Sequence, residues 1–238
     1  MTGVEIWSVE LAACNSLLVD IDRRWRGTIE TDATLAAIDH GHGPRAGANA
    51  ALRLVLARHS GRAIAQQAFG RLAGGKPTLP GGPHFSLSHT NGRALIAISE
   101  QHAVGVDIEA RRCLRMTEMR RSAIERAAEL IAGAPLPPIA GNDRALQAWV
   151  RLEALAKATG EGIGRVLERT GARPGRLPSN YRTLDEAPRV TDLSLEDGYF
   201  GAVAIVGAVA RSAVAPPVIH PMPTTAAALE AWLAALAT

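Results

Sequence analysis

The sequence predicts an α+β fold, because runs with the two-residue period of strands occur together with longer runs that have helical spacing. Strand patterns cover residues 4–9, 84–90, 94–99, 105–109, 190–195 and 199–206. Helical patterns begin near residues 32, 44, 117, 142 and 226. At 238 residues, of which 47% are apolar, the chain can bury a core as one large domain or two small ones.

The N-terminal part is expected to hold one strand and two helices. In the strand over residues 4–9, Ile6 is the residue most strongly expected to point inward. The first helix is expected from Asp32 to the glycines at 41 and 43. The turn at residues 39–42 contains two histidines, but no further ligands lie nearby, so an exposed loop is favoured over a metal site.

The second helix, over residues 44–59, has an apolar face formed by residues 52, 55 and 56. Arg45 and Arg58 are expected on its solvated side. Arg53 lies beside the apolar stripe, so its long side chain is able to reach over an edge into a cleft.

Residues 70–78 (GRLAGGKPT) resemble a phosphate-binding P-loop but depart from it at Pro77. A P-loop needs Ser or Thr directly after its lysine to hold Mg²⁺, and it continues as a helix. Pro77 has no hydroxyl, and the prolines and glycines that follow cannot form a helix. Nucleotide hydrolysis is therefore disfavoured, and Lys76 is either a phosphate contact on a glycine-flanked turn or a lysine at an exposed loop tip.

A hairpin is predicted from residue 84 to residue 99, with Asn91-Gly92 as its turn. Its first strand contains Ser88 and His89. Neighbouring strand residues point to opposite faces, and no GxSxG motif surrounds Ser88, so a hydrolase Ser-His pair is disfavoured. A binding role suits the hydroxyl and the imidazole better.

Two carboxylates alternate with apolar residues in Gly105-Val106-Asp107-Ile108-Glu109. In a strand, Asp107 and Glu109 share one face, about 7 Å apart, and Val106 and Ile108 share the other. Repulsion between the two carboxylates favours a cation beside them, and oxygen ligands suit Mg²⁺. An exposed strand with an acidic polar face explains the five residues equally well.

A helix over residues 117–132 is followed by a proline-rich loop and a second helix that begins at Asn142 or Asp143. One face of the second helix carries an aromatic, an acidic and a basic residue, together with small ones: Trp149, Glu153, Ala156, Lys157 and Gly160. Glu153 and Lys157 form either part of a site or a surface ion pair one turn apart.

The amino-acid composition indicates which kinds of partner and which cellular compartment to expect. The net charge of +3 and the arginine-rich set of cations favour a small phosphorylated ligand or an acidic protein, and they are too dispersed to indicate nucleic acid. Two cysteines without metal-ligand spacing indicate a reducing compartment. The longest apolar run is too short to cross a bilayer, so a cytoplasmic protein that binds no membrane is expected.

Four ordered motifs together resemble the Sfp-type 4′-phosphopantetheinyl transferases. They are the segments at residues 75–79 (GKPTL), 85–90 (FSLSHT), 104–109 (VGVDIE) and 149–160 (WVRLEALAKATG). The resemblance spans about residues 53–164, with an extension through the strand at 199–206. It implies two similar α+β halves related by a pseudo-twofold axis, with the active site at their junction. The expected ranges are 1–103 and 104–208, followed by an Ala/Pro-rich tail over 209–238 with a short helix.

The resemblance also implies a reaction and its residues. A holo-[acyl-carrier-protein] synthase of this type moves the phosphopantetheine arm of coenzyme A to a serine of an acyl or peptidyl carrier protein and releases adenosine 3′,5′-bisphosphate. Asp107, Glu109 and Glu153 would surround Mg²⁺, with Glu153 as general base and Lys157 neutralising charge on the pyrophosphate. The nucleotide half of coenzyme A would be bound by Arg53, Lys76, Ser88 and His89. A monomer is expected.

Three departures from the family pattern concern affinity and partner choice. Leu152 replaces a common lysine, and Arg151 points about 100° away around the helix. Asn49 replaces a basic residue one turn before Arg53, and Ser122 and Ala123 stand where an aromatic is usual. The alternative to an active enzyme is a coenzyme A or carrier-protein binding module that has lost turnover. The carrier, whether of fatty acid, polyketide, nonribosomal peptide or siderophore assembly, is not specified by these residues.

Overall fold

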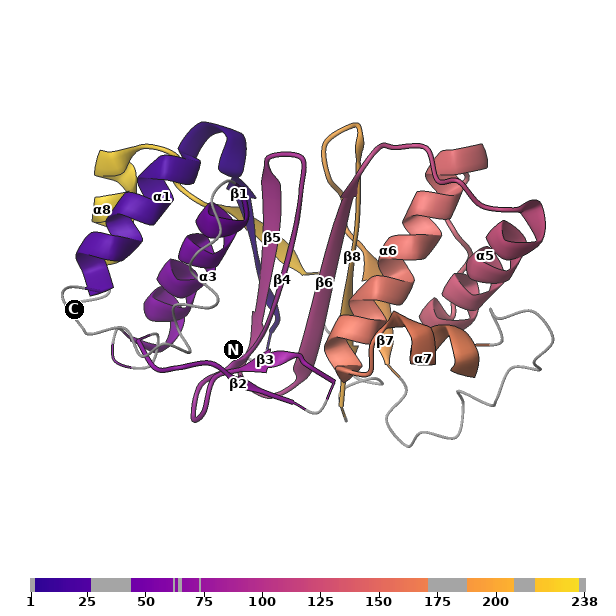
Figure 1. Ribbon diagram of the computed structural model, residues 1–238, viewed down its shortest axis with the longest axis horizontal. Coiled ribbons are helices and arrows are strands. Elements are labelled where there is room, and N and C mark those ends of the chain that lie inside the picture. The colour runs from indigo at the N-terminus through magenta and orange to yellow at the C-terminus, as the bar shows by residue number, and fades with distance from the viewer. Residues whose placement is uncertain are drawn as a thin grey trace.

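The computed structural model describes residues 3–26, 44–61, 63, 66–72, 74–170, 188–207 and 217–235. Two sheets lie in the middle of the molecule, with α1, α3 and α8 outside the first and α5, α6 and α7 outside the second (Figure 1). The fold is therefore a mixed α+β fold, as the sequence predicted. The helix expected at 32–43, the histidine turn within it and residues 171–187 lie outside the described residues.

The first sheet has the strand order β4-β5-β1-β9. Its strands are β1 (Glu5–Glu10), β4 (His84–Thr90), β5 (Arg93–Ser99) and β9 (Val218–Pro221). The β4–β5 hairpin turns at Asn91 and Gly92, both with positive φ, as the predicted two-residue turn requires. The helices of this half are α1 (Leu11–Arg26), α3 (Pro44–Ser60) and α8 (Ala226–Ala234), and a short β2–β3 hairpin pairs Gly70–Arg71 with Pro77–Thr78.

The second sheet has the order β6-β8-β7 and is antiparallel. Its strands are β6 (Ala103–Ala110), β7 (Arg189–Asp192) and β8 (Tyr199–Val206). The helices on its outer face are α5 (Glu118–Ala132), α6 (Gly141–Thr159) and α7 (Ile163–Arg169). Thr117 caps α5 by accepting a hydrogen bond from the Arg120 amide, and Gly133 ends the helix with φ of 61°.

The strand alternation distributes side chains among three apolar clusters. Ile96 and Ile98 of β5 face α1 and α3, whereas Leu95 of the same strand faces the second sheet. Val106 and Ile108 of β6 pack in the cluster between the two sheets, as their predicted shared face requires. Ala202 and Ala204 of β8 face α6. The β6 strand is thus covered on both sides.

Four features differ from the sequence prediction. Helix α1 was not predicted, although Leu11, Cys14, Leu18 and Ile21 form its buried face at helical spacing. Strand β7 is shorter than predicted, and β9 was not predicted at all. Helix α6 begins at Gly141, before the predicted Asn142 or Asp143.

The earlier start of α6 has a physical reason. The Asn142 side chain accepts a hydrogen bond from the Leu114 amide at 2.7 Å, and Asp143 accepts from Arg111. Both side chains therefore bind the segment after β6 instead of capping their own helix.

No described helix is long and apolar enough to cross a membrane.

Candidate functional site at the junction of the two sheets

The site is built where β6 and α6 come into direct backbone contact. A Cβ atom on Gly105 would lie 2.0 Å from the Ala154 carbonyl oxygen and 2.3 Å from the Ala158 nitrogen. Only glycine fits that approach. Because residues 105, 107 and 109 share one strand face, the contact turns Asp107 toward the helix that carries Glu153 and Lys157.

Asp107 is the most buried acid of the site, with 5% of its surface exposed. Its Oδ1 accepts hydrogen bonds from Lys157 Nζ at 2.6 Å and from Ser88 Oγ at 2.7 Å. Its Oδ2 is buried and has no hydrogen-bond partner among the described residues. Burial raises the pKa of Asp107, the Lys157 and Ser88 contacts oppose that rise, and the Glu109 charge adds to it.

Glu153 and Lys157 lie one turn apart on α6, and both line a cavity of about 580 Å³. Lys157 makes its ion pair with Asp107, so within the described part of the chain it forms no surface pair with Glu153. Burial raises the pKa of Glu153, and the charges of Asp107 and Glu109 raise it further, whereas the Lys157 charge lowers it. The site thus holds a carboxylate whose proton affinity is increased.

Glu109 lies on the same strand face as Asp107 but is held by a bidentate pair with Arg112, at 2.9 and 3.1 Å. Among the described residues, no three His, Cys, Asp or Glu side chains lie close enough together to form a metal-binding group. The three predicted carboxylates influence one another electrostatically without forming a closed ligand set in this arrangement.

Lys76 connects the two halves of the molecule. Its Nζ donates to the Val104 carbonyl of β6 at 2.9 Å and to the Ala158 carbonyl near the end of α6 at 3.1 Å. A cation at this position also complements the negative end of the helix dipole. Burial lowers the pKa of Lys76 to about 8. Lys76 lines the cavity and is not at an exposed loop tip.

The loop before Lys76 packs on the end of α6. A Cβ atom on Gly74 would lie 1.5 Å from the Gly160 carbonyl oxygen, so this approach also requires glycine. The close contact seats the Gly74–Lys76 turn against the C-terminus of the helix. The segment that resembles a P-loop in sequence therefore forms a two-stranded hairpin, and this hairpin is one wall of the cavity.

His89 also lines the cavity, together with residues from the start of α3. Desolvation at the cavity wall lowers the pKa of His89, and the charges of Arg45 and Lys157 lower it further. Arg45 was expected on a solvated face, but it lines the cavity, as does Asn49. Arg45, Asn49 and Arg53 are spaced four residues apart in the sequence. This spacing indicates that the three residues lie on one face of the helix.

Two residues predicted to bind the nucleotide, Arg53 and Ser88, lie outside the lining of the cavity. Arg53 is 4% exposed, and its guanidinium lies 4.8 Å from the centre of the Phe69 ring. Ser88 is buried and faces Asp107. Neither side chain is part of the cavity lining, whereas Phe69 is. Arg53 thus supports an aromatic wall residue.

The edge strands β4 and β6 meet through side-chain hydroxyls, a contact that we call the hydroxyl seam. Three hydroxyls of β4 accept hydrogen bonds from alternate amides of β6: Ser86 from Val106 at 3.0 Å, Ser88 from Ile108 at 3.3 Å and Thr90 from Ala110 at 3.4 Å. The free edge of β6 is satisfied in this way without a backbone ladder.

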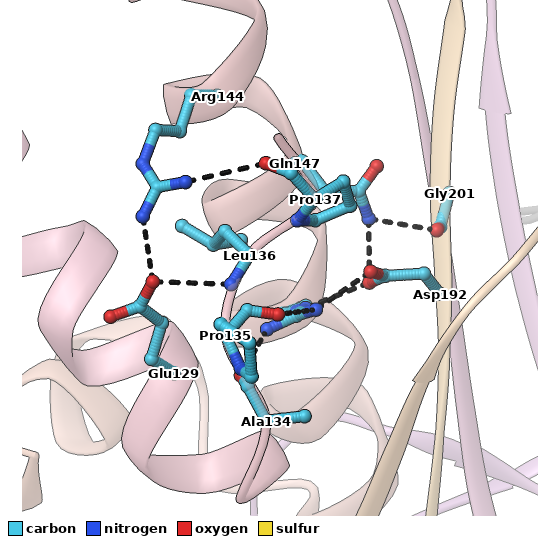
Figure 2. A network of polar contacts seen from close by, with 10 residues as sticks. Glu129, Ala134, Pro135, Leu136, Pro137, Arg144, Gln147, Asp192 and Gly201 are labelled. Carbon is cyan, nitrogen blue, oxygen red and sulfur yellow. Dashed lines mark hydrogen bonds and ion pairs between the residues drawn. The ribbon is translucent and has the colours of Figure 1, made fainter. Parts of the chain in front are cut away.

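The opposite face of α6 is anchored to the second sheet (Figure 2). Arg151 makes a bidentate pair with Asp192 of β7, both distances 2.7 Å, and Gln147 donates to the same carboxylate and to the Gly201 carbonyl. Arg151 therefore points away from the cavity, as its position on the helix predicted. Leu152, at the departure from the family pattern, is fully buried in the core behind the site.

Comparison with known proteins adds one relative. Over 163 residues, 66% of its length, the chain is 30% identical to the 4′-phosphopantetheinyl transferase HetI of Nostoc sp. (strain PCC 7120 / SAG 25.82 / UTEX 2576). The match covers 68% of that protein. No protein-family model matches the sequence.

Proposed function

The chain belongs to the Sfp-type 4′-phosphopantetheinyl transferase family, and on that basis we propose that it transfers the phosphopantetheine arm of coenzyme A to a serine of an acyl or peptidyl carrier protein. The observation that carries the proposal is the convergence on one cavity of Lys76 and His89 from the first half with Glu153 and Lys157 from α6. Cations from both halves suit a ligand with several phosphates.

In the proposed reaction, the carrier serine oxygen forms a bond to the phosphorus that bears pantetheine. The bond from that phosphorus to the bridging oxygen breaks, and adenosine 3′,5′-bisphosphate leaves with the electron pair. Glu153 accepts the serine proton, and its raised pKa suits a base that works near neutral pH. Lys157 and Lys76 hold the negative charge that develops on the phosphates.

We further propose that Asp107, Glu109 and Glu153 hold Mg²⁺. The buried Asp107 Oδ2, which no described group hydrogen-bonds, and the mutual repulsion of the acids both favour a cation. Bound Mg²⁺ would offset charge on the pyrophosphate oxygens. Arg112 would have to share Glu109 with the metal or a metal-bound water.

The two halves, 1–103 and 104–208, are proposed to be related by a pseudo-twofold axis. Each half places one sheet against two long helices on its outer side, which supports the idea (Figure 1). The described part of the tail, residues 217–235, belongs with the first half in this scheme, because β9 pairs with β1 and Leu229 of α8 is buried in the first core.

The test is a mass assay with an apo carrier protein, coenzyme A and Mg²⁺. We expect the carrier to gain the mass of one phosphopantetheine, and Glu153→Gln to slow this by about 10²–10⁴-fold, since a positioned base contributes that much. Glu230→Gln, on the exposed side of α8, is the matched control and should leave the rate unchanged. No mass gain with a panel of unrelated carriers would refute the proposal.

A second candidate is a coenzyme A or carrier-protein binding module without turnover. It is favoured by the pairing of Glu109 with Arg112 and by the buried Leu152, each of which removes a charge from the expected set. Coenzyme A binding in a calorimeter, together with no transfer to any carrier, would support the module instead of the enzyme.

A further inference from the structure

The hydroxyl of Ser88 occupies a position that the transfer reaction, as proposed above, does not use. Its oxygen lies 2.7 Å from Asp107 Oδ1 and 3.3 Å from the amide of Ile108, the residue that follows Asp107. A serine hydroxyl has one proton to donate, and it accepts hydrogen bonds through its lone pairs. The amide occupies one lone pair, and the carboxylate receives the proton.

These two contacts act on one structural unit. The Ile108 amide fixes the serine oxygen to the backbone of β6, and the donated proton fixes one carboxylate oxygen of the neighbouring residue. Lys157 Nζ contacts the same Oδ1 at 2.6 Å. Both donors therefore hold Oδ1, and Oδ2 is left buried without a described partner. The Asp107 carboxylate is therefore oriented with Oδ1 hydrogen-bonded and Oδ2 available to a further ligand.

We propose that Ser88 is a positioning residue that orients Asp107 to present Oδ2 to the divalent cation. This inference rests on the proposed function, because it assumes that Asp107 binds the metal. A hydrogen bond from a neighbour fixes the direction of a ligating carboxylate, and loss of such a partner typically costs 10–100-fold in metal affinity. Ser88 would thus act on coenzyme A only through the metal, not by direct contact with its nucleotide.

The seam offers a matched control. Thr90 accepts from the Ala110 amide at 3.4 Å, as Ser88 does from Ile108, but among the described residues its hydroxyl makes no hydrogen bond to a carboxylate. Thr90→Val and Ser88→Ala each remove one seam bond, and only the second removes the donor to Asp107. A purely structural role of the seam predicts the same result for both variants, whereas a positioning role separates them.

The experiment measures metal binding without turnover. Mn²⁺ is titrated into the protein with saturating coenzyme A and no carrier, and free Mn²⁺ is followed by electron paramagnetic resonance. We expect Ser88→Ala to weaken Mn²⁺ binding by about 10–100-fold, and Thr90→Val to change it by less than about 2-fold. Ser88→Thr, which keeps the hydroxyl, should restore most of the affinity.

A second arm separates the two roles considered for Ser88. Coenzyme A affinity is measured in chelator, without metal. We expect Ser88→Ala to leave it unchanged, whereas a direct contact with the nucleotide would weaken it. The inference is overturned if Ser88→Ala binds Mn²⁺ like Thr90→Val, if metal-free coenzyme A affinity falls, or if the wild type binds no Mn²⁺. Failure of carrier modification with the Mn²⁺ difference intact would refute the transfer reaction and leave the positioning role standing.

Discussion

Lys76 illustrates at the scale of one residue how a buried cation links stability to pH. The chain has only two lysines, Lys76 and Lys157, and both line the cavity. Lys76 gives two of its three N–H groups to carbonyls of the second half. Its third donor has no partner within the described part of the chain, so one side chain can both join the halves and bind a phosphate.

The pKa of about 8 leads to a prediction for Lys76→Met. The unfolded chain keeps the ordinary lysine pKa of about 10.4. Between these values the unfolded state binds more protons than the folded state, so the Lys76 contribution to stability rises with pH. We expect the free energy of unfolding of the wild type, minus that of the variant, to increase by roughly 1–3 kcal/mol from pH 7.5 to 10. Urea unfolding at several pH values measures it.

Taking the difference between the wild type and the variant removes the contribution of the other titrating groups, because these groups are the same in both proteins. A difference that stays flat between pH 7.5 and 10 would show that Lys76 keeps its ordinary pKa. A difference that falls would mean that the two carbonyl contacts stabilise the ammonium more than burial destabilises it.

At the scale of elements, the site depends on how closely β6 approaches α6. The strand lies on the backbone of the helix at Gly105, and the other side of the helix is tied to β7 by the Arg151–Asp192 pair. Buried Arg151 also donates to the Ala134 and Pro135 carbonyls, so the loop before α6 is held as well. The helix that carries Glu153 and Lys157 is therefore fixed from two directions.

Gly105→Ala should break the first of these contacts. The added methyl would lie 2.0 Å from a backbone oxygen, so strand and helix must separate. We expect a loss of about 1–3 kcal/mol in the free energy of unfolding, as for overpacked cores, and a larger loss of transfer activity because Asp107 moves away from Lys157. Chemical denaturation and the carrier mass assay measure the two effects.

The matched control is Gly164→Ala, in α7, where a Cβ meets no atom within 4 Å. Replacement of a helical glycine there should stabilise slightly, by about 0.5–1 kcal/mol. If Gly105→Ala were as mild as this control, the close packing of β6 on α6 would not be what orients the site.

For the whole molecule, sequence periodicity was sufficient to predict most strands, but not which residues line the cavity or which side chains far apart in the sequence meet there. β8 was predicted at its observed bounds, and the face shared by Val106 and Ile108 follows from the two-residue period. The bonds from Ser88 and Lys157 to Asp107 join residues 19 and 50 positions apart. No local period contains such pairs. The Asn142 side chain likewise serves a distant amide instead of its own helix.

Because both halves contribute to one cavity, a ligand bound there should hold them together. The cavity is lined by α3, β4 and the Gly74–Pro77 segment of the first half and by α6 of the second. The β6 amides of Val106 and Ile108 cross the same junction to the β4 hydroxyls. These amides can exchange with solvent only when the junction opens, and such opening would also release the ligand.

We therefore predict that coenzyme A slows hydrogen exchange at the amides of Val106 and Ile108. A ligand at 100 times its Kd stabilises the binding-competent state by about 2.7 kcal/mol, which limits the slowing to about 100-fold. The Leu229 amide, in the first turn of α8, is the internal control, since local fraying there leaves the cavity intact. Exchange measured by mass spectrometry with and without coenzyme A tests this. Slowing in β4 and α3 alone, with β6 unchanged, would mean that coenzyme A binds the first half without joining it to the second.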